Sequence, residues 1–286
     1  MRVVTQKPVA YDSPDHMQPR GTILDNNVNL AFNAKLCWWM STAQMRVLDL
    51  GCAGGGFVKS ILDHGGLAIG IEGCDRSKLA ERAEWATIPD RLFTADITEP
   101  FRVVEVAEDG TQRLLPFTVI TAWEVLEHLR KDQLAGVARN ITEHLAPHGV
   151  AIMSISPNEE IIDGVRLHQT VESKGWWVAK FSELGFEHHE AVLKYFGDDW
   201  VRGGENAPGS FHLVMTRRSE PLPNELRLLR LTPLVRCWDL PRWVGAMSLR
   251  KGRKIAHKLK PARLKRSYDK RMRAVSKWLA RRRAAG

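Results

Sequence analysis

One stretch of the sequence limits the folds open to this chain more than any other. Residues 47–50 form a short apolar run, and the glycine-rich segment 51–56 follows directly. An apolar pattern with helical spacing then starts at Phe57. This order predicts a strand, a tight turn and a helix. Because glycine lacks a Cβ and the start of a helix has unpaired N–H groups, the turn is expected to approach a ligand closely.

Composition argues against several classes of protein. The 286 residues are 44% hydrophobic, which is ordinary for a globular protein in water. The sequence has neither a charged and then apolar leader nor an apolar run of about 20 residues, so we expect no secretory signal and no membrane span, and a cytoplasmic location. The four cysteines form no C-x-x-C pair, which argues against a zinc ribbon or a disulfide framework.

Charge divides the chain into two parts. From Arg217 onward, 22 Lys and Arg stand against 4 Asp and Glu, a net +18, whereas the residues before Arg217 carry −9 of the total +9. We therefore predict a globular domain at 24–218 and a basic, amphipathic, helical extension at 219–286, with its main helix at 263–283. Pro8, Pro14 and Pro19, together with the lack of a hydrophobic period, predict an irregular N-terminal arm at 1–23. An anionic membrane surface and RNA phosphates both suit such a tail, and a solvated helix without a partner is the third interpretation.

Strands and helices are expected to alternate along the globular domain. Two of the expected strands end in acids, Glu72 and Asp96. Residues 103–116 are expected to form a surface hairpin around Asp109-Gly110. The expected strands are 47–50, 67–72, 92–97, 117–122, 150–156, 186–196 and 210–217. The expected helices are 24–40, one from Phe57, 77–86, 134–145 and 176–184.

These features together resemble the class I methyltransferases that depend on S-adenosylmethionine (SAM). The turn matches D-x-G-x-G-x-G from Asp49 except for Ala53 at the middle glycine, an acid ends the second strand, and Asp96-Ile97 ends the third. The L-x-P-x-G-x turn from Leu145 is a further similarity. The resemblance covers about 40–217. It implies a Rossmann-like α/β fold in which helices cover both faces of a seven-stranded, mostly parallel sheet.

The resemblance also implies a set of residues that hold SAM. Asp49 is expected to orient its amino end, and the glycines of the turn to admit its amino-acid moiety. Glu72 is expected to accept hydrogen bonds from both ribose hydroxyls, and Asp96 with Ile97 to bracket the adenine. The full set is Asp49, Gly51, Cys52, Ala53, Gly55, Glu72, Asp96, Ile97 and Trp123.

The end of the fourth strand carries the candidate catalytic residues. Glu124, Glu127 and His128 follow this strand, at the edge where open α/β sheets place their substrates. If the segment begins a helix, spacings of three and four residues put the three side chains on one face. Two carboxylates and an imidazole make either a site for Mg²⁺ or Mn²⁺, or an acid–base cluster without metal.

The run Glu-Val-Leu-Glu-His resembles two branches of the family. One comprises O-methyltransferases of ubiquinone biosynthesis, and the other small-RNA 2′-O-methyltransferases, in which the matching residues and a later His hold a divalent metal against a vicinal diol. His168 is the candidate later His, which makes Glu124, Glu127, His128 and His168 the expected catalytic and metal-binding set. The alternative is an E-H pair that caps the backbone or contacts the substrate without metal.

Three functions agree with these patterns. The first is SAM-dependent O-methylation of a glycan, lipid-linked sugar or other small diol, with the enzyme cytoplasmic and peripheral at a membrane. The second is 2′-O-methylation of RNA that the basic tail grips. The third is a SAM-binding module without turnover, which the intact acids Asp49, Glu72 and Asp96 argue against.

Overall fold

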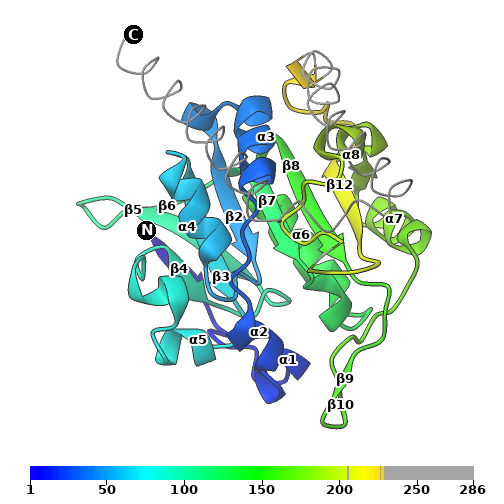
Figure 1. The fold of residues 1–286 in the computed structure, drawn as a ribbon. Coiled ribbons are helices and arrows are strands. Elements are labelled where there is room, and N and C mark those ends of the chain that lie inside the picture. Colours follow the sequence, from blue (N-terminus) through cyan, green and yellow to red (C-terminus); the bar gives the residue numbers. More distant parts are fainter. Residues whose placement is uncertain (205, 226, 229–286) are drawn as a thin grey trace, which may run out of the picture. The chain divides into compact units, whose positions relative to one another are not determined.

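The computed structural model describes residues 1–204, 206–225 and 227–228 (Figure 1). The expected helix over 263–283, and nearly all of the basic extension that contains it, lie outside the described residues. Among the helices of the described part, none is both long enough and apolar enough to cross a bilayer.

The described residues are built around one seven-stranded sheet. Its strand order is β11-β12-β8-β7-β2-β3-β4. Five neighbouring strands, from β8 to β4, are parallel, and β12 is antiparallel to both of its neighbours. This arrangement confirms the expected seven-stranded, mostly parallel sheet. The strands are β2 (Arg46–Leu50), β3 (Leu67–Glu72), β4 (Leu92–Thr94), β7 (Phe117–Trp123), β8 (Leu145–Ile155), β11 (Phe186–His188) and β12 (Phe211–Arg217).

Helices cover both faces of the sheet (Figure 1). On one face, Leu48 of β2 belongs to the same buried cluster as Val137 of α6 and Trp177 of α7. On the other face, Phe32 of α3 stacks on Phe196 of α8 with ring centroids 4.7 Å apart. The helices are α1 (Pro14–Met17), α2 (Arg20–Leu24), α3 (Leu30–Met40), α4 (Gly56–Asp63), α5 (Arg76–Leu79), α6 (Leu134–His144), α7 (Lys174–Glu183) and α8 (Glu190–Phe196), with 3₁₀ turns at Thr42–Gln44, Ala83–Ala86 and Leu126–His128.

The N-terminal arm was expected to be irregular, but it contains regular secondary structure. β1 (Arg2–Thr5) pairs antiparallel with β5 (Phe101–Val106), which pairs with β6 (Gln112–Leu114). The expected hairpin at 103–116 is thus confirmed and extended by a third strand. Two short helices, α1 and α2, follow β1 and lead to α3. The arm is therefore an ordered part of the fold.

Three further expectations about elements were wrong. The sixth strand ends at His188, and α8 takes up the remaining residues to Phe196 because Val192, Tyr195 and Phe196 fall on one buried helical face. The helix expected over 77–86 is split into α5 and a 3₁₀ turn, since Glu81 and Ala83 have positive φ angles. The helix expected from residue 24 starts at Leu30, where the Asn29 side chain caps it.

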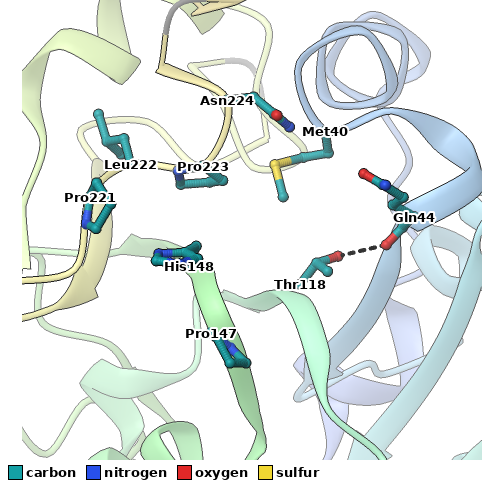
Figure 2. Close-up of a pocket in the computed structure, with 9 residues that line it drawn as sticks. All are labelled: Met40, Gln44, Thr118, Pro147, His148, Pro221, Leu222, Pro223 and Asn224. Atoms are coloured by element: carbon teal, nitrogen blue, oxygen red, sulfur yellow. Dashed lines mark hydrogen bonds between the residues drawn. The ribbon is translucent and has the colours of Figure 1, made fainter.

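A cavity of about 340 Å³ opens at the amino ends of β7 and β8 (Figure 2). Thr118 on its wall donates a hydrogen bond of 3.3 Å to the Gln44 carbonyl. The glycine-rich turn leaves the opposite, carboxyl end of β2, so the cavity is separate from the expected ligand site. Its lining residues are Met40, Gln44, Thr118, Pro147, His148, Pro221, Leu222, Pro223 and Asn224.

Candidate active site

The glycine-rich turn connects β2 to α4 at the carboxyl edge of the sheet. Gly51 and Gly55 have φ angles of +72° and +84°, a region that glycine enters without a Cβ penalty. A Cβ on Gly51 would clash with the Val125 side chain. The amides of Gly51 and Cys52 donate to the Ile71 carbonyl of β3 at 2.8 and 3.1 Å. Neighbouring backbone therefore fixes the shape of the turn.

Ala53 occupies the place where the resembling family has its middle glycine. Its φ of +46° is left-handed, a conformation that costs a residue with a Cβ on the order of 1 kcal/mol. Two hydrogen bonds hold it there: its amide donates to Glu72 Oε2 at 2.7 Å, and its carbonyl accepts from Trp85 Nε1 at 2.8 Å. The departure from glycine thus leaves the turn intact.

Two buried acids flank the turn. Asp49 accepts a 2.7 Å hydrogen bond from the Thr121 hydroxyl, and Glu72 accepts from the amides of Ala53 and Cys74, at 2.7 and 3.0 Å. Burial raises the pKa of Asp49 to about 8 and that of Glu72 to about 7, although these hydrogen bonds oppose the rise. A cationic ligand beside the two acids would favour their ionised forms.

The remaining expected cofactor residues lie at the same edge of the sheet. Asp96 follows β4, and its carboxylate accepts from the amide and hydroxyl of Thr98 at 2.9 and 2.7 Å. Ile97 is buried beside it. Trp123 ends β7, where its ring makes edge contacts with Phe32 and Phe57. The structure thus brings the ends of four neighbouring strands to one edge of the sheet.

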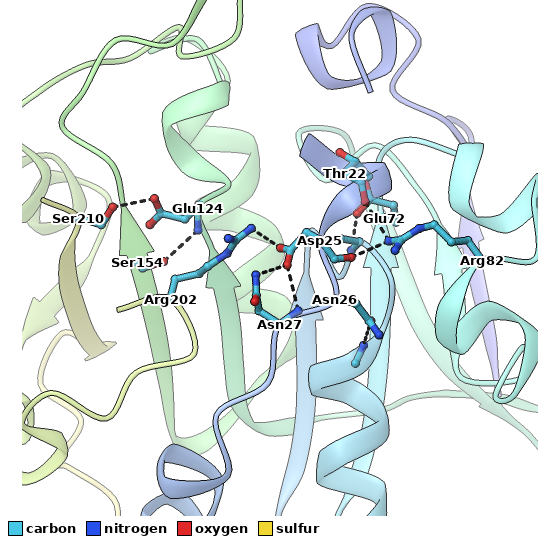
Figure 3. A network of polar contacts seen from close by, with 12 residues as sticks. Thr22, Asp25, Asn26, Asn27, Glu72, Arg82, Glu124, Ser154, Arg202 and Ser210 are labelled. Atoms are coloured by element: carbon cyan, nitrogen blue, oxygen red, sulfur yellow. Dashed lines mark hydrogen bonds and ion pairs between the residues drawn. The ribbon is translucent and has the colours of Figure 1, made fainter. Parts of the chain in front are cut away.

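Residues between α2 and α3 lie over the glycine-rich turn (Figure 3). Gly56 is the first residue of α4, and its amide donates a hydrogen bond of 2.7 Å to Asn26 Oδ1. The Asp25 carbonyl accepts from the Gly54 amide and from Arg82, and the Asp25 carboxylate pairs with Arg202. The sequence analysis assigned no role to these residues. The polar run Asp25-Asn26-Asn27 next to an expected helix was the available signal.

Glu124 does not share a helical face with Glu127 and His128, contrary to expectation. β7 runs on through Trp123, and Glu124 then has a φ of +55°, so no helix starts there. A short 3₁₀ turn, Leu126–His128, follows instead. The Glu124 amide donates to Ser154, and its Oε2 accepts from the Ser210 hydroxyl at 2.7 Å. A non-glycine residue held at positive φ at the end of a central strand indicates a functional position.

Three of the four expected catalytic residues come together. Glu127, His128 and His168 each offer a ligand atom within 4.8 Å of the others, and the two imidazole rings lie 4.7 Å apart, edge to face. Glu127 is fully buried, and its Oε1 accepts from the Ser156 amide at 2.7 Å. His168 Nδ1 faces the Asn158 carbonyl at 2.5 Å, and its Nε2 lies 3.2 Å from Glu160.

Burial and neighbouring charges shift the pKa values of the three groups in this cluster. Burial, followed by the charge of Glu124, raises the pKa of Glu127 to about 8. Burial alone would lower the pKa of His128, but the carboxylates of Asp15 and Glu127 outweigh it and raise that pKa to about 9. Burial and the nearby His128 lower the pKa of His168. Strong perturbation of several groups at one sheet edge is typical of catalytic sites.

Several buried polar atoms at this edge lack hydrogen-bond partners among the described residues. They are Trp123 Nε1, Glu124 Oε1, Glu127 Oε2 and Arg202 Nε. Buried polar atoms in folded proteins are nearly always satisfied, so a group of unsatisfied ones marks a place where a ligand or water completes the bonding. This edge of the sheet therefore has buried donors and acceptors that no described residue uses.

A model of the methyltransferase domain family matches residues 27–194, more than half of the chain. The chain belongs to this methyltransferase family. It is a SAM-dependent methyltransferase with a Rossmann-like fold, as the resemblance of the sequence implied, and SAM is its cofactor. A search of curated proteins finds no match.

A comparison with solved structures matches several other methyltransferases. The CcbJ methyltransferase of Streptomyces caelestis is 14% identical, with 73% of this chain and 98% of that chain covered and a TM-score of 0.47. The glycopeptide N-methyltransferase MtfA, complexed with S-adenosyl-L-homocysteine, is 15% identical, with 65% and 89% covered and a TM-score of 0.44. The O-methyltransferase NcsB1 of neocarzinostatin biosynthesis is 14% identical, with 65% and 52% covered and a TM-score of 0.44.

Proposed function

We propose that this methyltransferase methylates a hydroxyl group on a small molecule or glycan, such as a lipid-linked sugar or another small diol. The observation that carries the proposal is the cluster of Glu127, His128 and His168, with Glu124 close by, at the carboxyl end of β7. This edge of the sheet also carries the glycine-rich turn, which leaves the neighbouring strand β2.

The cofactor side of the cleft supplies the alignment. When SAM is bound, Asp49 would hold its amino end, the backbone of the glycine-rich turn would contact its amino-acid moiety, and Glu72 would accept hydrogen bonds from the ribose hydroxyls. Asp96 and Ile97 would hold the adenine, and Trp123 completes the set of cofactor residues. Because the methyl group leaves an activated sulfonium in an in-line displacement, alignment and removal of one proton from the acceptor are the main tasks.

The acceptor side removes the proton. Glu124 Oε1 and Glu127 Oε2 are buried without partners, so each is available to accept a hydrogen bond from an acceptor hydroxyl. The high pKa of Glu127 makes its carboxylate a stronger base than a solvated one. In the proposed step, the acceptor oxygen forms a bond to the methyl carbon, the sulfonium–methyl bond breaks, and the hydroxyl proton passes to a carboxylate of the cluster.

The same residues fit a divalent metal. His128 and His168 each have Nδ1 against an oxygen atom, from Asp15 and from the Asn158 carbonyl, and metal-binding histidines are commonly oriented in this way. Glu127 adds a carboxylate. Two imidazoles and one carboxylate suit Mn²⁺ better than Mg²⁺, which prefers oxygen ligands. Such an ion would lower the pKa of a bound hydroxyl and fix a diol in place.

The test is methyl transfer from labelled SAM to a fractionated cell extract. We expect label in a carbohydrate or small-molecule fraction, and its loss when the fraction is first oxidised with periodate, which cleaves vicinal diols. Sensitivity of the labelled product to ribonuclease would instead support RNA 2′-O-methylation. Full turnover in EDTA would reject the metal, and absence of transfer to any fraction would reject the proposed function.

We further propose that residues 219–286 act as a separate extension of the methyltransferase domain at 24–218 and bring the cytoplasmic enzyme to an anionic membrane surface. The support is the net charge of +18 from Arg217 onward. Co-sedimentation with phosphatidylserine vesicles, but not with phosphatidylcholine vesicles, is the expected result, with weaker binding at higher salt. Binding to RNA but not to vesicles would overturn the membrane proposal.

A further inference from the structure

The N-terminal turn Ser13–Met17 adds a carboxylate to the acceptor side from outside the matched family domain, which starts at residue 27. Its local sequence fixes its shape. Ser13 caps α1 by accepting from the His16 amide at 3.1 Å, and Pro14 occupies the first helical position, where proline is favoured. Asp15 then projects from the first turn.

Asp15 reaches a catalytic candidate. Its Oδ1 lies 3.1 Å from His128 Nδ1, and the exposed fractions of the two side chains are only 27% and 13%. The contact becomes an ion pair when His128 is protonated, and it does not have the geometry of an aligned hydrogen bond. Since solvent screens a pair this well covered only weakly, the carboxylate holds the imidazole by charge as well as by contact.

Independent contacts hold the turn on both sides of the cleft. On the cofactor side, the Ala10 amide donates to the Gly73 carbonyl at 2.9 Å, one residue beyond Glu72. On the acceptor side, Gln18 Nε2 donates to Asp163 at 2.8 Å, in the loop between β9 (Ile161–Ile162) and β10 (Val165–Arg166). These contacts hold the segment that carries α1 and do not involve Asp15. The Asp15 carboxylate can therefore interact with His128.

We propose that Asp15 is a positioning residue that fixes the orientation of the His128 ring and keeps a proton on Nδ1. When the ring is neutral, Nε2 is then the nitrogen left for the acceptor or a metal. The role of Nε2 rests on the proposed function, whereas the hold of Asp15 on the ring does not. This residue lies upstream of the domain shared with the family, so the acid–base apparatus of the chain extends beyond that domain.

The test uses the full-length, metal-free protein with [¹⁵N]histidine, in which long-range ¹H–¹⁵N spectra report which ring nitrogen carries a proton. The variant His128→Gln assigns the signal. We expect a protonated Nδ1 in the native protein and, in Asp15→Asn, a shift of the Nδ1 resonance toward the unprotonated position, with part of the native pattern restored in Asp15→Glu.

Gln18→Ala is the matched control, because it loosens the same turn without touching His128. An unchanged His128 spectrum in a folded Asp15→Asn variant would overturn the proposal, and so would an equal change in Gln18→Ala. In a second experiment, Mn²⁺ alone is added to the protein and its binding is followed by electron paramagnetic resonance. The substitution Asp15→Asn is expected to weaken the affinity for Mn²⁺ about 10- to 100-fold. If the native protein binds no Mn²⁺, the metal proposal fails while the ¹⁵N result still tests Asp15.

Discussion

The candidate site has a cofactor half, with Asp49 and Glu72, and an acceptor half, with Glu124 and Glu127. The two halves differ in how their buried carboxylates are hydrogen-bonded. In the cofactor half, Asp49 and Glu72 accept hydrogen bonds from a hydroxyl and from backbone amides. In the acceptor half, Glu124 and Glu127 each keep one buried carboxylate oxygen without a partner. An unsatisfied buried polar group costs roughly 1–3 kcal/mol. Both carboxylate oxygens of Glu72 and one of Asp49 are thus bonded within the protein, whereas Glu124 and Glu127 each keep one buried oxygen that no described residue bonds.

This difference predicts separate roles for the two halves. If the cofactor half binds and the acceptor half performs the chemistry, a substitution in one half changes affinity and a substitution in the other changes turnover. Variants with the opposite pattern would show that the halves are not independent.

The largest expected effect is on turnover in Glu127→Gln. Loss of the charged carboxylate removes the candidate base, so we expect methyl transfer to fall by roughly 10²- to 10⁴-fold. The dissociation constant for SAM should stay within about twofold, because Glu127 is not in the cofactor half. Label transfer to the active extract fraction and calorimetry measure the two quantities. The exposed Glu187→Gln is the matched control and should change neither. Equal losses of SAM affinity and of turnover in Glu127→Gln would show that the two halves do not have separate roles.

A smaller effect is expected on affinity in Asp49→Asn. Loss of a charged hydrogen-bond partner should raise the dissociation constant for SAM by about 10- to 100-fold, corresponding to roughly 1.5–3 kcal/mol. Calorimetry measures it. The same variant should make the ligand-free protein more stable at neutral pH, because it removes a carboxyl group whose ionised form is buried.

The sign of this stability change follows from the pKa. Burial raises the pKa of Asp49 from 3.8 to about 8, so the folded protein binds this proton more tightly than the unfolded chain. Stability is therefore lost as the pH rises from about 4 to about 8, by at most about 1.4 kcal/mol per pH unit. The thermal midpoint of Asp49→Asn should exceed that of the native protein by more at pH 8 than at pH 5. A constant difference would contradict the assignment.

The next effect is the pH dependence of SAM binding. Asp49 and Glu72 have pKa values of about 8 and about 7 without ligand, and a cationic ligand favours their charged forms. Affinity should therefore rise between pH 6 and pH 8, by at most about tenfold per unit for each proton released. Calorimetry in two buffers with different ionisation enthalpies counts the protons. Release that is unchanged in Glu72→Gln would show that Glu72 does not contribute.

The smallest expected effect is in Ala53→Gly. Glycine relieves the positive φ but adds entropy to the unfolded chain, so the free energy of unfolding should change by less than about 1 kcal/mol. Ala135→Gly in α6 is the matched control, where φ is ordinary and glycine should destabilise by about 1 kcal/mol. Thermal unfolding measures both. A loss in Ala53→Gly as large as in the control would show that the turn stores no strain.

The cofactor half could be predicted from the sequence because its signals are local. The turn, the acid of β3 and the pair Asp96-Ile97 lie in order within about 50 residues, each next to an apolar strand. Pattern and spacing carry such information. The acceptor half combines residues near positions 15, 127 and 168, and only the folded sheet shows that they meet.

Particular errors have particular causes. Residues 186–196 were expected to form one strand, although Val192, Tyr195 and Phe196 have helical spacing. Glu124 was expected in a helix because a left-handed residue at the end of a strand leaves no pattern in the sequence. The ordered N-terminal arm was missed because its stability comes from distant partners such as β5.

The contact between Gln18 and Asp163 spans 145 positions of the chain. During synthesis, the N-terminal turn leaves the ribosome early but cannot make this contact until residues beyond β8 have followed. Closing so long a loop is entropically unfavourable before the sheet has brought its ends together. The contact that fixes the N-terminal turn beside His128 is therefore expected to form late, after the central strands have paired.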